Sequence, residues 1–470
     1  MGSLPNEKVL PDFADTSLVL THPTEAEKQQ TWRLNHGEWG GPLSLKAYMQ
    51  REPFLASTAL TSQGGIMHWI LTETTAQNEP RKILASCETI RKRVLYVHAL
   101  DKGTETEVKE GISYGIGSVY TYPEFRGKKY AARMLKDLSE TLKTWPEQQY
   151  QENQSPSNGV KLSNGDTILE NGAPEAQQTN GQTKKEVICT ALWSDIGKKF
   201  YASKGWPVFE SSHVEFPSSF PFAPGITSIF DQAAKIPHTS LTLTPVTNSN
   251  LASLCSEDET QLRAQMKENS QTTGRASFAF RPDADVFRWH WAREDFLTPH
   301  VFPGCTPSEV RGMIATVTTN SSSSQVSTDG SSPQTQNPLN GDAKAQETRV
   351  WAIWARNYGS DAATKSENNT LYILRFVIMR PRGSTEPDSK ALQLAFNAIL
   401  HSALDTARTW HCGKVNLWNP SSQVKALAAG SGVKHHFVDR EMESISSMMW
   451  YGPEKESDVD WFANEKFCWC

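Results

Sequence analysis

Several short stretches in the first half of the chain are rich in β-branched, aromatic and aliphatic residues and are bounded by turn-forming or charged residues. Such stretches are typical of strands. They comprise residues 17–20, 65–71, 82–87, 111–120, 187–193 and 208–216. Between the first two, Thr24 with Glu27 three residues later forms a capping box that predicts a helix start, and a second helix is expected near residues 42–44.

A helical period begins after Arg126. Apolar side chains recur there every three or four residues, which predicts a long amphipathic helix. They are Ala131, Met134, Leu135, Leu138, Leu142 and Trp145. A short helix is expected at residues 197–206. The order of strand, two helices, three strands, helix, strand, helix and strand predicts an α+β fold with a mixed sheet.

The second half repeats part of this order. Strands are predicted at residues 289–291, 350–354, 371–379, 414–418 and 447–451. A long helix is predicted at residues 389–409, and a short one after Ser421 and Ser422. A second α+β unit is therefore expected, without the basic turn that precedes the long helix of the first.

Two polar, low-complexity segments interrupt these patterns, at about residues 146–185 and 318–348. Their few large apolar residues bury too little surface to offset the entropy cost of ordering, so both are predicted to be disordered insertions. Patterned structure resumes directly after each one, which places them inside domains. The predicted domains are residues 1–216 and 217–470.

Composition limits the kinds of binding partner and the cellular compartment that are expected for this protein. Lys and Arg number 47 against 52 Asp and Glu, a net charge of -5, so no basic surplus favours nucleic acid or an anionic membrane. No apolar run approaches the roughly 20 residues of a membrane-spanning helix, and residues 1–6 do not begin a signal or transit peptide. The 7 scattered cysteines suit reduced thiols and lack zinc-site spacing. A cytoplasmic protein without a metal is expected.

Residues 122–131 carry the strongest chemical signal. They lead from a strand into the long helix, where unpaired backbone N–H groups and the helix dipole favour an anion. Arg126, Lys128 and Lys129 add positive charge, which is unfavourable for an isolated helix N-terminus, and Gly127 permits close approach to the backbone. The segment fits neither a Walker loop nor a dinucleotide fingerprint. It predicts a cradle for another pyrophosphate-bearing ligand.

The sequence of residues 123–131, Pro-Glu-Phe-Arg-Gly-Lys-Lys-Tyr-Ala, resembles the acetyl-CoA signature of the GNAT acetyltransferases. Arg126, Gly127 and Ala131 match that signature, whereas Lys129 occupies the position of its second glycine. Residues 200–206 resemble the Phe/Tyr helix of the same family. Three further segments resemble the fungal L-lysine N-acetyltransferase family within it, namely residues 32–40, 190–197 and 461–467.

This resemblance implies a GNAT-type mixed sheet with flanking helices, followed by a degenerate GNAT-like domain. It also implies acetyl-CoA as co-substrate and transfer of its acetyl group to the ε-amino group of free L-lysine, a step of lysine catabolism. The reaction would proceed by direct attack in a ternary complex. Three alternatives remain, namely an enzyme acting on a protein lysine, an enzyme acting on another small amine, and a non-catalytic acetyl-CoA sensor.

The resemblance also assigns residues to the donor site. The strand before the turn would diverge from its neighbour, as a bulge favoured by Gly115 and Gly117 allows. Backbone groups on that strand and the turn would bind the pantetheine arm and the pyrophosphate. These residues are Val119, Tyr120, Thr121, Arg126, Gly127, Lys128, Lys129, Tyr130 and Ala131. Tyr201 would protonate the departing CoA sulfur.

A lysine amine has a pKa near 10.4 and needs a base or a water chain to lose its proton at neutral pH. The strand position that carries a glutamate in some GNAT enzymes falls near Ser113, so Glu88, His68 or water is expected to serve. The second domain is expected to wall the acceptor pocket. Arg288, Arg293 and Arg375 are candidates for binding an acceptor carboxylate, without a ranking among them.

Two aromatic segments complete the predictions. Residues 289–291 could line the acceptor pocket, although paired tryptophans more often pack in a core. The C-terminal residues 467–470 are too aromatic to remain in water and are expected to dock on the body of the protein.

Overall fold

The computed structural model describes residues 10–74, 81–100, 105–154, 186–218, 226–320, 346–359, 362, 364–380 and 388–469. Most of the two predicted insertions, residues 155–185 and 321–345, lies outside this part of the chain, as do residues 1–6. The segments 146–154, 318–320 and 346–348 lie inside it. Residues 146–154 belong to a helix, and residues 318–319 and 346–348 belong to strands rather than to insertions.

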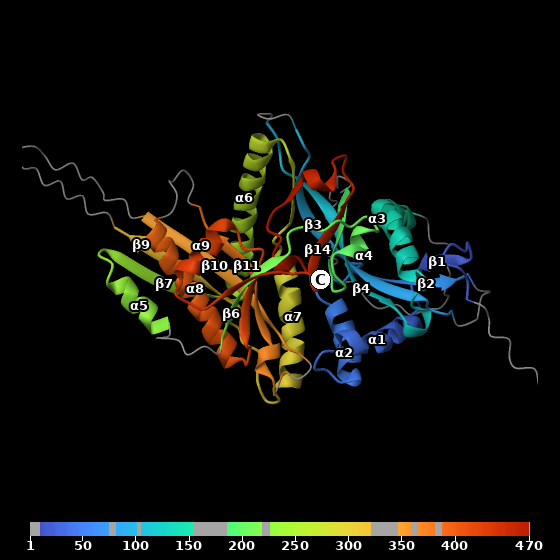
Figure 1. The fold of residues 1–470 in the computed structure, drawn as a ribbon, viewed down its shortest axis with the longest axis horizontal. Coiled ribbons are helices and arrows are strands. Elements are labelled where there is room, and N and C mark those ends of the chain that lie inside the picture. Colours follow the sequence, from blue (N-terminus) through green and yellow to red (C-terminus); the bar gives the residue numbers. More distant parts are fainter. Residues whose placement is uncertain are drawn as a thin grey trace, which may run out of the picture.

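Within the described residues the strands form two mixed sheets, which confirms the α+β fold class (Figure 1). The first sheet has the order β1-β2-β3-β4-β5-β14, with β8 on β3 and β15 on β8. Its strands are β1 (Leu18–Thr21), β2 (Ile66–Glu73), β3 (Ala85–Val97), β4 (Lys109–Thr121), β5 (Val187–Ser194), β8 (Ala276–Phe280), β14 (Ile445–Trp450) and β15 (Val459–Trp461). Strands β4 and β5 run parallel, and α3 (Tyr130–Gln154) connects them.

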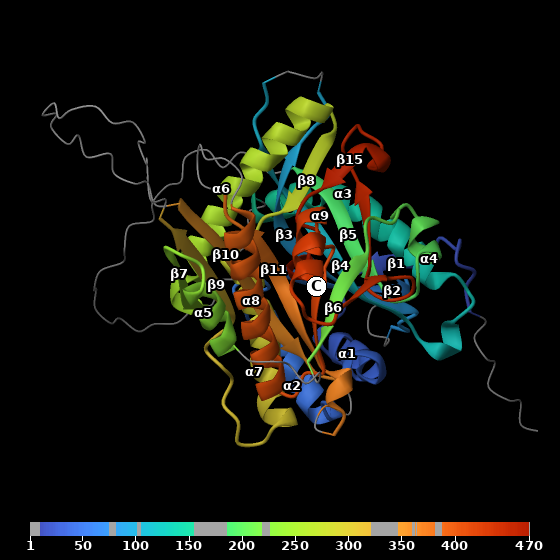
Figure 2. The ribbon, with the colours of Figure 1, turned by 60° about the vertical axis from the view of Figure 1, so that its left-hand side comes forward.

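The second sheet has the order β13-β6-β12-β11-β10-β9-β7. Its strands are β6 (Ser212–Pro217), β7 (Thr239–Val246), β9 (Gly312–Thr319), β10 (Gln346–Asn357), β11 (Thr370–Ile378), β12 (Lys414–Trp418) and β13 (His436–Asp439). Strands β11 and β12 are its parallel pair, joined by α8 (Ser389–Thr409), which covers one face of this sheet (Figure 2). The short helix α9 (Ser422–Gly430) follows β12.

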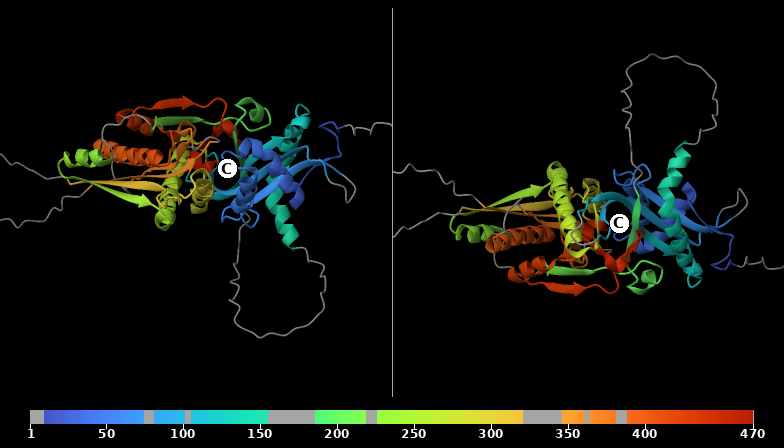
Figure 3. Two further views of the ribbon diagram at one scale, coloured as in Figure 1. Left: turned by 90° about the horizontal axis from the view of Figure 1, so that it is seen from below. Right: turned by 90° about the horizontal axis from the view of Figure 1, so that it is seen from above.

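The remaining helices position the site between the sheets. The chain folds α1 (Glu25–Trp39) and α2 (Leu45–Ala56) against the first sheet, and α6 (Asn248–Thr273) and α7 (Ala284–Val301) lie between the two sheets (Figures 1 and 3). Two short helices, α4 (Lys199–Ala202) and α5 (Ile226–Ala234), complete the set. None of the helices seen in these ranges has both the length and the apolar character that crossing a bilayer requires.

The local start signals of the first helices are confirmed. Thr24 Oγ1 accepts from Glu27 N at 3.3 Å, while the Glu27 carboxylate accepts from Thr24 N at 2.8 Å, so the capping box is closed. Ser44 caps α2 near the position where a helix is predicted. The predicted long helix at 389–409 coincides with α8.

The strand predicted at 289–291 is wrong, because these residues lie inside α7. The buried side chains of this helix recur at helical spacing, with Phe287, His290, Trp291, Glu294 and Leu297 all enclosed. A run of three aromatic residues is too short to distinguish a strand from a helix, and the longer period decides the structure. The sequence patterns also failed to indicate α6, β7, β8 and β9.

The two sheets exchange strands across the predicted boundary at residue 216. The predicted strand 208–216 becomes β6 and pairs with β12 of the second sheet, while β8, β14 and β15 from the C-terminal half join the first. One buried cluster accordingly joins side chains of both sheets, including Val94, Phe278, Trp351 and Met448. The division into residues 1–216 and 217–470 remains a prediction.

Candidate active site

Strands β4 and β5 separate part of the way along the first sheet. Their parallel pairing runs from Ile112 opposite Val187 to Ile116 opposite Leu192, and beyond this point β4 continues to Thr121 without pairing to β5. The divergence opens a pocket of about 190 Å³ between the strands, α2 and α7. The strand predicted to diverge before the basic turn is therefore found to do so.

A β-bulge occurs on β4 at the mouth of this opening. Ser86 pairs with Tyr120 but Glu88 pairs with Gly117, so β4 holds one extra residue. That residue is Ser118, whose φ of 51° lies in the left-handed region. The bulge directs the Ser118 hydroxyl to Glu88 Oε2, at 3.2 Å.

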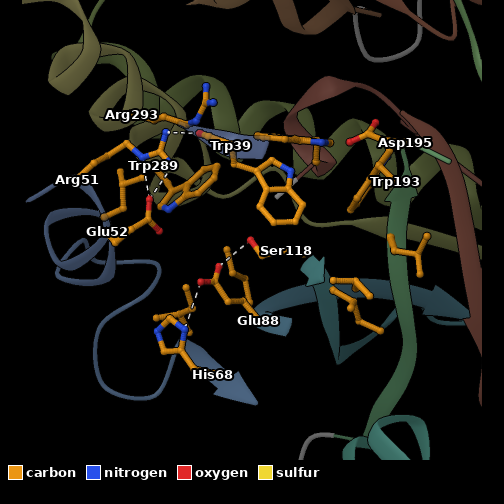
Figure 4. Close-up of a pocket in the computed structure, with 18 of the residues that line it drawn as sticks. Trp39, Arg51, Glu52, His68, Glu88, Ser118, Trp193, Asp195, Trp289 and Arg293 are labelled. Carbon is orange, nitrogen blue, oxygen red and sulfur yellow. Dashed lines mark hydrogen bonds and ion pairs between the residues drawn. The ribbon is translucent and has the colours of Figure 1, made fainter. Parts of the chain in front are cut away.

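Glu88 and His68 form a cross-strand pair facing the pocket (Figure 4). Their side chains share one face because the residues lie opposite each other on β2 and β3, and His68 Nδ1 is 3.3 Å from Glu88 Oε1. Burial acts to raise the pKa of Glu88, but the hydrogen bonds from His68 and Ser118 and the electrostatic interactions with His68 and Arg51 outweigh it and lower that pKa. The carboxylate is thus ionised at neutral pH.

The Ser113 position is closed to the pocket. Its side chain is buried, and Ser113 Oγ accepts from Cys189 Sγ at 3.2 Å. The pocket is lined instead by the carboxylate of Glu88, on β3.

Tyr201, on α4, lies on the pocket wall beside Leu192. Burial, reinforced by the negative charge of Asp195, raises the pKa of the phenol well above its ordinary value of 10. The hydroxyl stays protonated at neutral pH and can donate a proton. Of the predicted site residues, Tyr201, Glu88, His68 and Val119 meet at this one pocket.

The basic turn follows the divergent end of β4 and is exposed. Gly127 has a φ of 80°, and a side chain there would meet nothing within 4 Å, so the backbone is open to a ligand. Among the described residues, no protein acceptor receives a hydrogen bond from the backbone N–H groups of residues 127–131. Five unpaired donors at the start of α3 form a site for an anion.

The side chains of the turn differ in their roles. Arg126 lies over the Tyr120 ring at 5.4 Å and donates from Nε to the Thr121 carbonyl at 3.1 Å, which holds it at the end of β4. Tyr130 is buried and its hydroxyl donates to the Pro11 carbonyl at 2.6 Å, so only its backbone N–H faces the turn. Lys129 places its amine 4.9 Å from the centre of the Phe13 ring.

Lys129 adopts a φ of 64°, the conformation that a glycine would take without strain. We expect Lys129→Gly to raise the free energy of unfolding by about 1 kcal/mol, as measured by urea denaturation. Lys128→Gly is the matched control, because Lys128 has no positive φ and its replacement should lower stability by about 0.5–1 kcal/mol. Equal destabilisation by the two substitutions would contradict strain at Lys129.

A charged cluster closes the opposite end of the pocket. Arg51 on α2 donates from Nη2 and Nε to Glu52 Oε1 at 2.6 and 2.9 Å, and Arg293 approaches from α7 (Figure 4). Trp39, Trp289 and Trp469 form apolar walls around these groups. The sequence patterns missed Arg51 and Glu52, since nothing in α2 marks the face that meets the opening. Arg293 and Trp289 were among the candidates.

The second sheet has a corresponding divergence. Pairing of β11 with β12 ends at Ile373 opposite Leu417, and β11 continues to Ile378. The C-terminal segment fills part of this opening, because Glu465 Oε2 accepts from Phe376 N at 2.8 Å and the Glu465 carboxylate also pairs with Arg375. The second opening therefore holds a protein carboxylate next to the backbone N–H of a divergent strand.

The C-terminal tail docks on the body, as predicted. Phe467 is fully buried against Phe287, and Lys92 Nζ donates to the Cys468 carbonyl at 2.7 Å. Trp469 reaches the first pocket, and Cys470 lies outside the described residues. The tail thus supplies a wall of the site.

A mixed sheet with a bulged, divergent fourth strand, followed by a turn of free N–H groups and a helix, defines a GNAT-like site. Comparison with known proteins agrees. The family description LYC1 GNAT-like C-terminal domain matches residues 228–470, more than half of the chain. The chain belongs to this LYC1-like GNAT family.

Three proteins that resemble this chain share at most about a quarter of their aligned residues with it. A lysine acetyltransferase of Yarrowia lipolytica is 26% identical over 302 residues, which cover 59% of this chain and 65% of that protein. The chain thus spans less than two thirds of this relative. A probable N-acyltransferase of Enterococcus faecalis aligns with a TM-score of 0.41 at 10% identity, covering 92% of this chain and 72% of that one. N-myristoyltransferase of Saccharomyces cerevisiae with bound myristoyl-CoA aligns with a TM-score of 0.41 at 9% sequence identity. That alignment covers 95% of this chain and 82% of the N-myristoyltransferase chain.

Proposed function

We propose that this protein transfers the acetyl group of acetyl-CoA to the ε-amino group of free L-lysine. The observation that carries the proposal is the path from the turn of free N–H groups at residues 127–131, along the divergent end of β4, to a pocket with an ionised carboxylate and a protonated phenol. Family membership and the name of the Yarrowia lipolytica relative support the same activity.

The donor would bind along β4. The N–H groups of residues 127–131 suit the pyrophosphate, with Arg126, Lys128 and Lys129 supplying positive charge. The unpaired edge of β4 at Val119, Tyr120 and Thr121 suits the amide-bearing pantetheine arm. This arrangement would direct the thioester towards Ser118 and Glu88, at the mouth of the pocket.

The nitrogen of the ε-ammonium group must lose two protons, and the departing sulfur must gain one. Glu88 would accept the first proton, directly or through water, and the freed nitrogen pair would attack the thioester carbon. The new C–N bond forms as the C–S bond breaks, and the Tyr201 hydroxyl would give its proton to the departing sulfur. The second proton on the nitrogen would then pass to the Tyr201 oxygen or to water, which leaves a neutral amide. His68 would hold the Glu88 carboxylate in position across the strand pair. Positioning both reactants in one pocket supplies much of the rate enhancement.

Thiol release from acetyl-CoA tests this function, with free L-lysine, ornithine, a histone-like peptide and no acceptor compared side by side. Saturable release with lysine is expected. Release with the peptide alone would indicate that the acceptor is a protein lysine. Release with ornithine but not lysine would favour another small amine. CoA binding without release for any amine across several pH values would favour the sensor.

A further inference from the structure

Arg293 lines the pocket and has no carboxylate partner in the part of the chain that the structure describes. Its Nη1 donates to Asn357 Oδ1 at 2.7 Å and its guanidinium lies 5.6 Å from the centre of the Trp469 ring. Among the described residues, no carboxylate lies within ion-pair distance of it. A guanidinium carries five N–H donors, so most of its hydrogen-bonding capacity is unused. A largely enclosed guanidinium in this state is a site for an anion.

The other two arginine candidates are already satisfied. Arg375 is buried between Asp258 and Glu465. Arg288 is exposed, pairs with Asp285 at 3.0 Å, and does not line the pocket. The structure thus ranks Arg293 first among three residues that sequence patterns could not separate.

Glu52 lies in the same cluster, and its two carboxylate oxygens differ in their contacts. Both hydrogen bonds from Arg51 end on Glu52 Oε1, and among the described residues no group bonds Oε2. Burial and the neighbouring charge of Arg51 lower the pKa of Arg293 to about 10, even though Glu52 opposes the shift. A negative group bound beside Arg293 would stabilise the charged form of its guanidinium, which burial and Arg51 disfavour.

We infer that Arg293 binds the α-carboxylate of the acceptor and that Glu52 Oε2 receives its α-ammonium group. The acceptor is therefore a free amino acid rather than a peptide or a simple amine, an inference that rests on the proposed acetyl transfer. The aliphatic chain of the acceptor runs past the walls of Trp39 and Trp289 towards Glu88 (Figure 4). This orientation places a distal amine, not the α-amine, at the base.

The experiment compares kcat/KM for L-lysine with that for cadaverine, which is lysine without its carboxylate. Wild-type protein should prefer lysine, and Arg293→Met should lower the lysine-to-cadaverine ratio by about 100-fold. Arg288→Met is the matched control on the same helix, and should leave the ratio unchanged. The same comparison with 6-aminohexanoate, which lacks the α-amine, should show Glu52→Gln lowering the preference for lysine by about 10-fold.

Two readouts separate the possible failures. An equal loss for lysine and cadaverine in Arg293→Met would overturn the inference and leave acetyl transfer intact. If no amine is acetylated, the proposed function fails, and calorimetry decides the inference. Lysine binding that Arg293→Met abolishes would support it, and absence of lysine binding to the wild-type protein would overturn it. Should Arg293→Met fail to fold, Arg293→Lys keeps the charge but loses the planar fork, and should lower the ratio by about 10-fold.

Discussion

Glu88→Gln is expected to lower kcat for acetyl transfer to lysine by about 10²–10⁴-fold at pH 8, while binding of CoA is retained. The amide keeps the size of the side chain and can still bond Ser118, but it cannot take a proton from the ε-ammonium group. Glu88 is the carboxylate held ionised by His68 and Ser118, whereas Glu52 is engaged by Arg51 and its pKa is raised, first of all by burial.

The pH dependence follows from the same groups. The lowered pKa of Glu88 keeps the base ionised at neutral pH and above, and the raised pKa of Tyr201 keeps the phenol protonated at neutral pH and well into the alkaline range. Neither group then limits the rate. Instead kcat/KM should rise with pH towards the lysine pKa near 10.4, as the fraction of free amine grows.

Controls distinguish a base from a structural residue. Glu124→Gln, an exposed carboxylate before the basic turn, should leave kcat within about twofold of wild type. A Glu88→Gln protein with near wild-type kcat would exclude Glu88 as the base. Substitution of His68 by Gln should cost less than the Glu88 change, because His68 positions the carboxylate; the reverse order would make His68 the base.

Arg375→Met is expected to lower the free energy of unfolding by about 3–5 kcal/mol. The guanidinium donates from Nε and Nη2 to both oxygens of Asp258, at 2.8 and 2.7 Å, and also pairs with Glu465. All three side chains are buried, so the substitution leaves two enclosed carboxylates without a compensating charge. Burial acts to lower the pKa of Arg375, but the two carboxylates outweigh burial, so the net effect is a raised pKa. The charged form of the guanidinium is therefore strongly favoured in this cluster.

Urea denaturation and the midpoint of thermal unfolding measure this effect. Arg288→Met is again the matched control, because its exposed ion pair with Asp285 should contribute no more than about 1 kcal/mol. Since Glu465 also bonds Phe376 N, loss of Arg375 should loosen the C-terminal segment and the pocket wall at Trp469. A loss below about 1 kcal/mol would contradict the importance of the cluster.

The sequence by itself determined the features that depend on neighbouring residues. Side-chain spacing and turn chemistry predicted the capping box of Thr24 and Glu27, the extent of α8 and the position of β12. The basic turn at residues 126–131 was recognisable because its glycine and its charges are contiguous. Glu88, His68 and Tyr201 were named in advance, and the structure brings them to one pocket.

Only the tertiary structure decided the features that depend on distant residues. Strand β6 pairs in the second sheet and β14 in the first, because hydrogen-bond partners for a strand edge are chosen by the whole fold rather than by local pattern. The left-handed φ of Lys129 contradicts its residue type and is held by the surrounding strand and helix. The roles of three similar arginines differ for the same reason. Arg375 meets two buried carboxylates and Arg293 meets none among the described residues, and such long-range pairing has no signature in adjacent residues.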